Sequence, residues 1–74
     1  MLIYQKIKEL RKERGLTQKK VAEGTGYTQA AVTEWERGIS RPTWEAVKAL
    51  ALFFDVTSDY LLGLENEFGE KISK

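Results

Sequence analysis

The sequence predicts an all-α fold, a compact bundle of five short helices around a single core. Its 74 residues provide for one small domain and no second one. Threonine and glycine divide the chain into short blocks, and within each block apolar residues recur every three or four positions, as on one face of a helix. No stretch combines sustained apolar–polar alternation with β-branched residues, so we expect no strand.

The first two predicted helices are separated by Gly15. The first helix carries three apolar residues on one face, Ile3, Ile7 and Leu10. Gly15 ends it, and Thr17 caps the next helix, over residues 18–23, because a threonine hydroxyl can accept a hydrogen bond from a free backbone N–H of a first turn. Residues 24–26, Gly-Thr-Gly, do not continue a helix comfortably and are expected to form a tight turn.

The three remaining helices each follow a candidate capping residue. Thr28 precedes a helix over residues 29–37, and Thr43 precedes a fourth helix. Thr57 or Ser58 caps a short fifth helix. The residues expected to face the core from the third and fourth helices are Val32, Trp35, Val47, Leu50, Ala51 and Phe54.

The composition argues against several classes of function. The chain contains neither cysteine nor histidine, so disulfides, the usual ligands of zinc and cysteine or histidine nucleophiles are absent. We therefore expect no enzyme, metal ion, cofactor or small-molecule ligand. The longest apolar run, residues 49–54, is far shorter than the roughly 20 residues that span a bilayer. Neither a membrane segment nor a signal peptide is recognisable, and the expected location is the cytoplasm.

Charge is distributed unevenly along the chain. Residues 1–48 contain ten lysines and arginines against six acidic residues, a net charge of +4, whereas residues 49–74 contain two against five, a net charge of −3. A basic front and an acidic back suit a protein that places one face on a polyanion and keeps the other in solvent. A chance distribution in so short a chain is the alternative.

Residues 18–35 have the pattern of a helix-turn-helix, two short helices joined by a turn that contains glycine. Ala22 is expected where the two helices cross, because a larger side chain would push them apart. Gly26 falls in the turn, where a positive φ angle is easiest for glycine. Val32 and Trp35 are expected to fill the angle beneath the second helix.

This stretch resembles the Cro/repressor-type, XRE-like helix-turn-helix family, to which the lambdoid phage repressors belong. The similarity extends over residues 3–63, and the matching segments are Leu10-Arg11, Gly15-Leu16-Thr17-Gln18, Trp35-Glu36-Arg37-Gly38, Arg41-Pro42 and residues 55–63. The resemblance implies a lambda-repressor-like DNA-binding domain over residues 1–63, with the motif formed by the second and third helices. It also implies a sequence-specific, double-stranded-DNA-binding transcriptional regulator, a repressor that binds a palindromic operator as a homodimer.

The resemblance places the helix over residues 29–37 in the major groove, where its outward side chains read bases. The expected base-reading residues are Gln29, Ala30, Thr33 and Glu34. Gln29 can pair with N6 and N7 of adenine, and Ala30 can approach a thymine methyl group, although both are also ordinary residues on a solvated helix. Thr33 can contact a base edge or a phosphate. Glu34 either accepts from a cytosine amino group or pairs with Arg37 and faces no base.

A second set of residues is expected to contact DNA phosphates: Gln18, Lys19, Thr28, Arg37, Ser40 and Arg41. Gln18 begins the first motif helix, where its backbone N–H and side chain can meet a phosphate oxygen. In the lambdoid repressors this glutamine also braces the first glutamine of the recognition helix, which is Gln29 here. For the lysine and the arginines, ordinary surface charge is the alternative interpretation.

Arg11 and Glu36 are expected to form a structural ion pair. Relatives with arginine and glutamate at these positions join the first helix to the recognition helix through a partly buried pair, which the resemblance implies here. Two alternatives remain. Either both side chains are exposed to solvent, or Arg11 contacts a phosphate directly.

The C-terminal part of the chain is expected to hold a dimer interface, because one recognition helix contacts too few bases for useful specificity. The apolar residues expected there are Tyr60, Leu61, Leu64 and Phe68, unless Leu61 and its neighbour Leu62 belong to the core. Residues 64–74 form a tail that is a short extra helix, an arm or a disordered end.

Two other functions stay open. The fold can serve a protein-interaction module that does not bind DNA. It can also serve an antitoxin whose DNA binding is weak or depends on a partner. The chain is either a complete small regulator or the N-terminal domain of a longer one.

Overall fold

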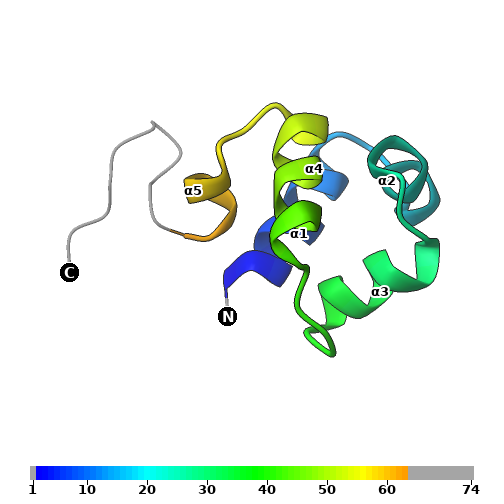
Figure 1. Ribbon diagram of the computed structural model, residues 1–74. Coiled ribbons are helices and arrows are strands. Elements are labelled where there is room, and N and C mark those ends of the chain that lie inside the picture. Colours follow the sequence, from blue (N-terminus) through cyan, green and yellow to red (C-terminus); the bar gives the residue numbers. More distant parts are fainter. Residues whose placement is uncertain (1, 64–74) are drawn as a thin grey trace.

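The computed structural model describes residues 2–63, and Figure 1 shows the arrangement of its helices. Five helices are present in this range: α1 (Leu2–Glu13), α2 (Gln18–Thr25), α3 (Gln29–Arg37), α4 (Trp44–Phe54) and α5 (Ser58–Leu61). The described residues contain no strand. The prediction of an all-α fold with five short helices is therefore confirmed. The predicted tail, residues 64–74, lies outside the described residues.

Threonine side chains fix where four of the five helices begin. The hydroxyl oxygens of four residues each accept a hydrogen bond from the backbone N–H three residues further on, at 3.0–3.2 Å: Thr17, Thr28, Thr43 and Thr57. This contact satisfies one of the N–H groups that a helix leaves free in its first turn, and it contributes about 1 kcal/mol. At the fifth helix the capping residue is Thr57 rather than Ser58.

Helix α2 continues beyond the predicted end at residue 23. Gly24 and Thr25 are helical, and only Gly26, with a φ of 82°, turns the chain. The prediction of a tight turn is therefore wrong for the first two of these residues. Gly24 has another role, since a Cβ atom there would lie 2.0 Å from Cε1 of Phe53 in α4. Helix α2 thus approaches α4 so closely that this position has no room for a side chain while the Phe53 ring stays in place.

Replacing Gly24 by alanine is expected to destabilise the domain by about 1–2 kcal/mol, although alanine is the better helix former by about 1 kcal/mol. The added methyl group displaces the Phe53 ring, which meets the Phe54 ring edge-on with centroids 5.1 Å apart. Urea unfolding of Gly24→Ala, Phe53→Ala and the double variant measures the effect. If the clash is the cause, Gly24→Ala becomes stabilising once residue 53 is alanine. Equal destabilisation in both backgrounds would contradict this explanation.

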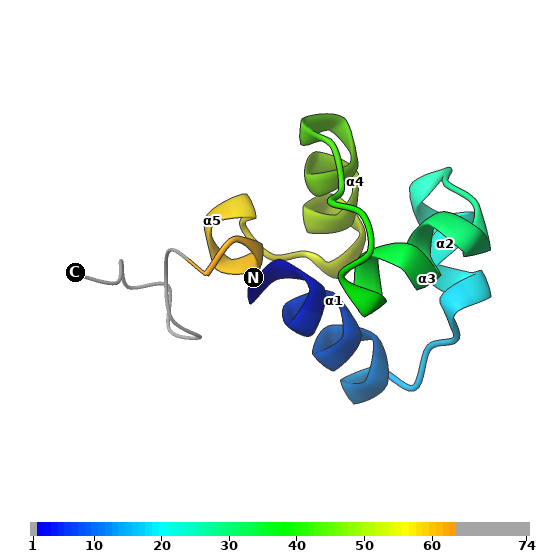
Figure 2. The ribbon, with the colours of Figure 1, turned by 90° about the horizontal axis from the view of Figure 1, so that it is seen from below.

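The core lies where α1 and α4 pass through the middle of the bundle, with α2 and α3 on one side and α5 on the other (Figures 1 and 2). Its buried apolar residues come from all five helices: Ile3, Ile7, Leu10, Val21, Ala22, Val32, Trp35, Ala46, Val47, Leu50, Ala51, Phe54 and Leu61. Every inward-facing residue predicted for the first, third and fourth helices is in this set. The described part of the chain has no helix with the length and apolar character of a membrane span.

The burial of one residue in helix α5 shows that part of the predicted dimer interface is wrong. Leu61 is fully buried in the core, so it is not available to a partner subunit. Its neighbour Leu62 is 40% exposed, and Tyr60 is partly buried against the core. Leu64 and Phe68 lie outside the described residues. Since a single helical turn is not stable alone, α5 depends on its contacts with α1 and α4, and the buried Leu61 is its part of the core.

Candidate nucleic-acid interface

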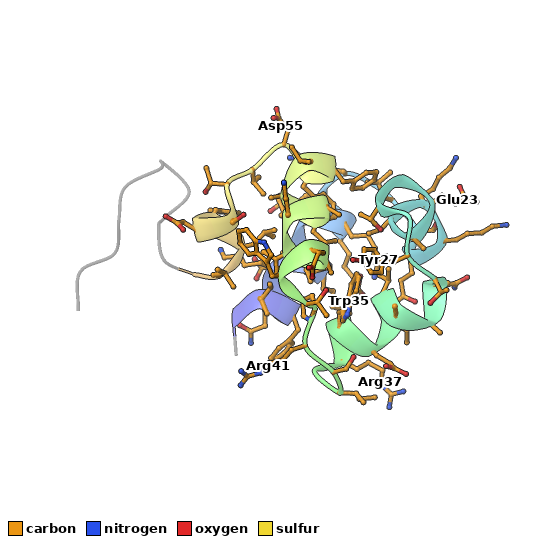
Figure 3. All side chains as sticks on the ribbon, viewed as in Figure 1. Glu23, Tyr27, Trp35, Arg37, Arg41 and Asp55 are labelled. Carbon is orange, nitrogen blue, oxygen red and sulfur yellow. The ribbon has the colours of Figure 1, made fainter. Side chains whose placement is uncertain are left out.

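Helix α3 is anchored to the core through one face. Val32 is fully buried and Trp35 nearly so. The Trp35 ring meets the Tyr27 ring edge-on, with centroids 5.2 Å apart (Figure 3). Tyr27 belongs to the connection between α2 and α3, so this contact fixes the direction in which α3 leaves the turn.

The opposite side of α3, here called its outward face, is made up of Gln29, Ala30, Thr33, Glu34 and Arg37. All of these residues are exposed except Thr33, which is partly buried. Arg37 stands at the C-terminal end of the helix, where Figure 3 shows it extending away from the bundle. The spacing of three or four residues places these side chains on neighbouring turns. The structure thus brings the four predicted base-reading residues together on one accessible surface.

Behind this face, Arg11 of α1 holds Glu36 of α3. Arg11 Nε donates to Glu36 Oε2 at 2.6 Å and Nη2 donates to Oε1 at 3.0 Å, while Nη1 donates to the carbonyl oxygen of Leu16 at 3.0 Å. The Glu36 side chain is 3% exposed. The hydrogen bonds to Glu36 raise the pKa of the Arg11 guanidinium above its ordinary value, against the opposing effect of burial. The predicted ion pair is therefore present, and three of the five N–H groups of the Arg11 guanidinium are engaged within the protein.

Gln18, the first residue of α2, joins this ion pair to the outward face of α3. Its Nε2 donates to Glu36 Oε1 at 3.1 Å, and its Oε1 accepts from the Thr33 hydroxyl at 2.7 Å. The expected brace between Gln18 and Gln29 is therefore wrong for this chain, because within residues 2–63 Glu36 and Thr33 hold the Gln18 side chain instead. The buried carboxylate accounts for the difference, since it attracts the amide NH₂ group inward.

The link between Gln18, Thr33 and Glu36 is not among the sequence predictions. Thr33 and Glu36 are three residues apart on one helix, so their side chains lie one above the other where α3 meets the start of α2. That spacing indicates that Thr33 and Glu36 are neighbours, but it does not by itself place Gln18 beside them.

Glu34 is held by the loop that follows α3. Its Oε1 accepts a hydrogen bond from Ser40 Oγ at 3.2 Å. No ion pair joins Glu34 to Arg37 within the described residues, so that predicted alternative is wrong. A serine hydroxyl has one hydrogen, and Ser40 gives it to Glu34. The predicted contact of Ser40 with a phosphate therefore requires this hydrogen bond to open.

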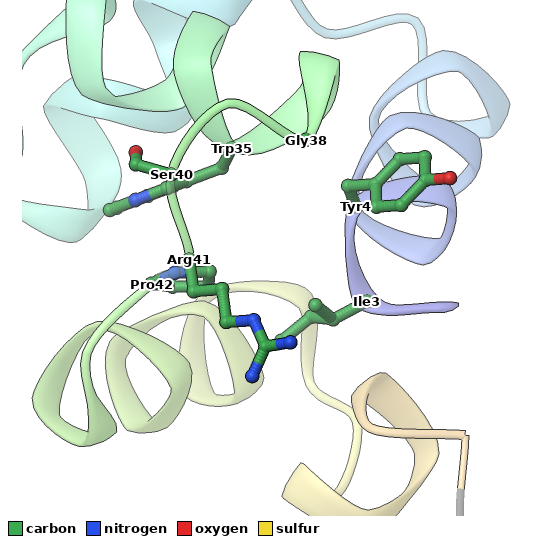
Figure 4. Close-up of a pocket in the computed structure, with 7 residues that line it drawn as sticks. All are labelled: Ile3, Tyr4, Trp35, Gly38, Ser40, Arg41 and Pro42. Carbon is green, nitrogen blue, oxygen red and sulfur yellow. The ribbon is translucent and has the colours of Figure 1, made fainter. Parts of the chain in front are cut away.

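The other predicted phosphate contacts are all exposed: Lys19, Thr28, Arg37 and Arg41. In Figure 3, Arg37 and Arg41 lie on the same side of the molecule, one on each side of the loop after α3. Arg41 lines a pocket of about 240 Å³, and Figure 4 shows its guanidinium extending toward Ile3. These positions make the cations accessible to a large anion such as a nucleic acid.

Comparison with known proteins points to the same motif. A family model described as helix-turn-helix matches residues 7–61. The transcriptional activator BcrR of Enterococcus faecalis is 38% identical over 65 residues, which are 88% of this chain and 32% of BcrR. The cryptic phage CTXphi transcriptional repressor RstR of Vibrio cholerae is 35% identical over 68 residues, 90% of this chain and 61% of RstR. The chain thus spans about a third to three fifths of the length of these two relatives.

Solved structures of two DNA-binding proteins share the fold. The P22 c2 repressor in complex with a synthetic operator matches with a TM-score of 0.78 and 28% identity, over 82% of this chain and 92% of that chain. The N-terminal DNA-binding domain of SinR from Bacillus subtilis matches with a TM-score of 0.78 and 29% identity, over 82% and 90%. The lambda-repressor-like fold is thereby confirmed. Since the family model also covers most of the sequence, the chain belongs to the Cro/repressor-type, XRE-like helix-turn-helix family.

Proposed function

We propose that this chain is a transcriptional regulator that binds double-stranded DNA sequence-specifically by placing α3 in the major groove. The observation that carries the proposal is the division of α3 into two faces. Val32 and Trp35 fix it to the core, while Gln29, Ala30 and Glu34 are exposed. A major groove about 12 Å wide admits one such helix. Similar structures of the P22 c2 repressor and of SinR were solved in complex with DNA, which supports the proposal.

Gln29 is the strongest candidate for a base contact. It lies in the first turn of α3, and recognition helices of this motif contact bases through their N-terminal residues. Only its main-chain carbonyl takes part in a side-chain hydrogen bond within residues 2–63, so its amide is available to N6 and N7 of adenine. Ala30 stands beside it with a side chain short enough to permit close approach to a thymine methyl group.

Phosphate contacts complete the proposed interface. Lys19, Thr28, Arg37 and Arg41 are exposed and can bind phosphates of the DNA backbone. Each cation that binds a phosphate contributes about 0.9 to the slope of log affinity against log salt concentration on B-form DNA. Arg11 is outside this set, because Glu36 and the Leu16 carbonyl engage its guanidinium.

We also propose that the chain acts in the cytoplasm as a homodimer on a palindromic operator. A single α3 contacts few base pairs, and a two-fold dimer doubles that number with half-sites about one helical turn apart. Tyr60 and Leu62 support this proposal, since both keep exposed surface beside α5 after Leu61 is assigned to the core.

Selection from a random duplex pool, followed by titration of the selected duplex at two salt concentrations, tests the proposal. We expect a palindromic consensus that is bound far more tightly than random DNA. Binding without a consensus would contradict sequence-specific regulation and favour a non-specific or partner-dependent binder, such as an antitoxin. No binding at either salt concentration would favour the protein-interaction module.

Replacing Gln29 by alanine is expected to weaken binding to the selected duplex by about 1–3 kcal/mol and to relax the preference at one base pair. The reason is the loss of a bidentate contact to adenine. Affinities for single-base-pair variants of the duplex measure both effects. Gln5→Ala is the control, since it removes another exposed glutamine side chain, from α1, and should leave base preference unchanged. An unaltered preference in Gln29→Ala would remove Gln29 from the base-reading residues.

A further inference from the structure

We infer that Thr33 faces DNA as a hydrogen-bond acceptor only, and that it selects a base with an amino group at the major-groove edge, adenine or cytosine. This inference rests on the proposed function and specifies what one position of the outward face of α3 recognises. Guanine O6 and thymine O4 are acceptors, so the committed Thr33 hydroxyl can form no hydrogen bond with either of them.

The hydrogen of the Thr33 hydroxyl is committed within the protein. Thr33 Oγ1 lies 2.7 Å from Gln18 Oε1 and 3.0 Å from the main-chain carbonyl oxygen of Gln29. Both of these neighbours are acceptors, and a hydroxyl has a single hydrogen. Whichever neighbour receives it, the hydroxyl has no second hydrogen to give to a base.

The orientation of the Gln18 amide follows from the charges behind it. Gln18 Nε2 is 3.1 Å from Glu36 Oε1, and the Glu36 carboxylate accepts two hydrogen bonds from Arg11. Turning the amide round would place Gln18 Oε1 against a carboxylate oxygen, where two acceptors repel each other. Gln18 Oε1 must therefore face Thr33, and it can only accept from it.

What Thr33 can still offer is an oxygen lone pair and a methyl group. The residue is only partly buried, so part of its side chain stays open to an approaching base edge. A guanine O6 or thymine O4 could gain a hydrogen from Thr33 only if the 2.7 Å bond to Gln18 opened. That opening would leave the Gln18 carbonyl oxygen unpaired beside a buried ion pair, which is unfavourable.

Deleting single amino groups from the selected duplex tests the inference. Purine replaces adenine, or 2-pyrimidinone replaces cytosine, at each position of a half-site, and the full 74-residue chain is titrated against each duplex. We expect one position at which the wild-type protein loses affinity roughly fivefold, the usual range for one hydrogen bond, while Thr33→Val loses none. Comparing the two proteins cancels the effect of each deletion on the duplex itself. Thr33→Ser keeps the hydroxyl and should respond as the wild type does.

The outcomes separate this inference from the proposed function. If the wild type selects a consensus but both proteins respond alike at every position, Thr33 is not the reader of an amino group. A keto base preferred at the position where Thr33→Val changes selectivity would also overturn the inference. If the wild type selects no duplex, the proposed function fails and the inference fails with it. Thermal unfolding shows whether each variant is folded. If Thr33→Val does not fold, the wild type alone still tests the inference, because unchanged wild-type affinity after every amino-group deletion would refute it.

Discussion

Replacing Arg11 by alanine is expected to lower the free energy of unfolding by about 3–5 kcal/mol, the range for removing one partner of a buried ion pair. The Glu36 side chain is only 3% exposed, so its carboxylate would lose two guanidinium hydrogen bonds while staying out of water. The Leu16 carbonyl oxygen would lose its donor as well. The usual stability per residue gives a domain of 74 residues about 4–11 kcal/mol in total, so this loss is a large share of it.

Urea unfolding measures this loss, and Lys20→Ala provides a matched control. Lys20 Nζ lies 4.0 Å from Glu23 Oε1 with side chains 68% and 56% exposed, so its removal should change stability by less than about 1 kcal/mol. Equal losses in the two variants would refute the structural role of Arg11. In DNA titrations, Arg11→Ala should keep the salt slope of the wild type. A slope reduced by about one would show instead that Arg11 contacts a phosphate.

Replacing Leu61 by alanine is expected to destabilise the domain by about 2–5 kcal/mol, the range for truncating a fully buried leucine. Leu61 is 0% exposed and belongs to the core, and its helix α5 contacts both α1 and α4. Leu62→Ala removes the same number of atoms from the next residue, which is 40% exposed. That variant should change the free energy of unfolding by about 0.5 kcal/mol, as is usual for surface positions.

The two leucine variants also separate the core from a subunit interface. Unfolding curves give the stability of each, and sedimentation under conditions where both are folded gives the oligomeric state. We expect Leu61→Ala to keep the oligomeric state of the wild type. If the Leu61→Ala protein kept full stability but its oligomer dissociated, Leu61 would belong to the dimer interface. That result would contradict its assignment to the core.

The beginnings of the helices can be predicted from this sequence because a threonine cap acts within three residues. Thr17, Thr28 and Thr43 each precede a helix as expected. The end of α2 could not be predicted in the same way. Gly24 looks like the start of a turn, but its absent side chain makes room for Phe53, which is far away in the sequence. A contact between distant residues leaves no local signal.

In the candidate site, too, side-chain contacts between residues far apart in the sequence could not be predicted from local patterns. The spacing of Val32 and Trp35 is enough to identify which side of α3 faces inward. The partner of Gln18 is not set by spacing alone, because it depends on where Arg11 holds the Glu36 carboxylate. Family resemblance therefore supplied the correct ion pair but the wrong partner for the glutamine.

The two faces of α3 also determine how easily this domain can acquire new targets during evolution. Gln29 and Ala30 are exposed and lie outside the core, so in the proposed interface substitutions there would change recognition without cost to folding. Thr33 is different, because its hydrogen bond to Gln18 connects it with the buried Glu36. Descendants of this chain should therefore diversify first at positions 29 and 30, and a change at position 33 should be accompanied by a change at position 18.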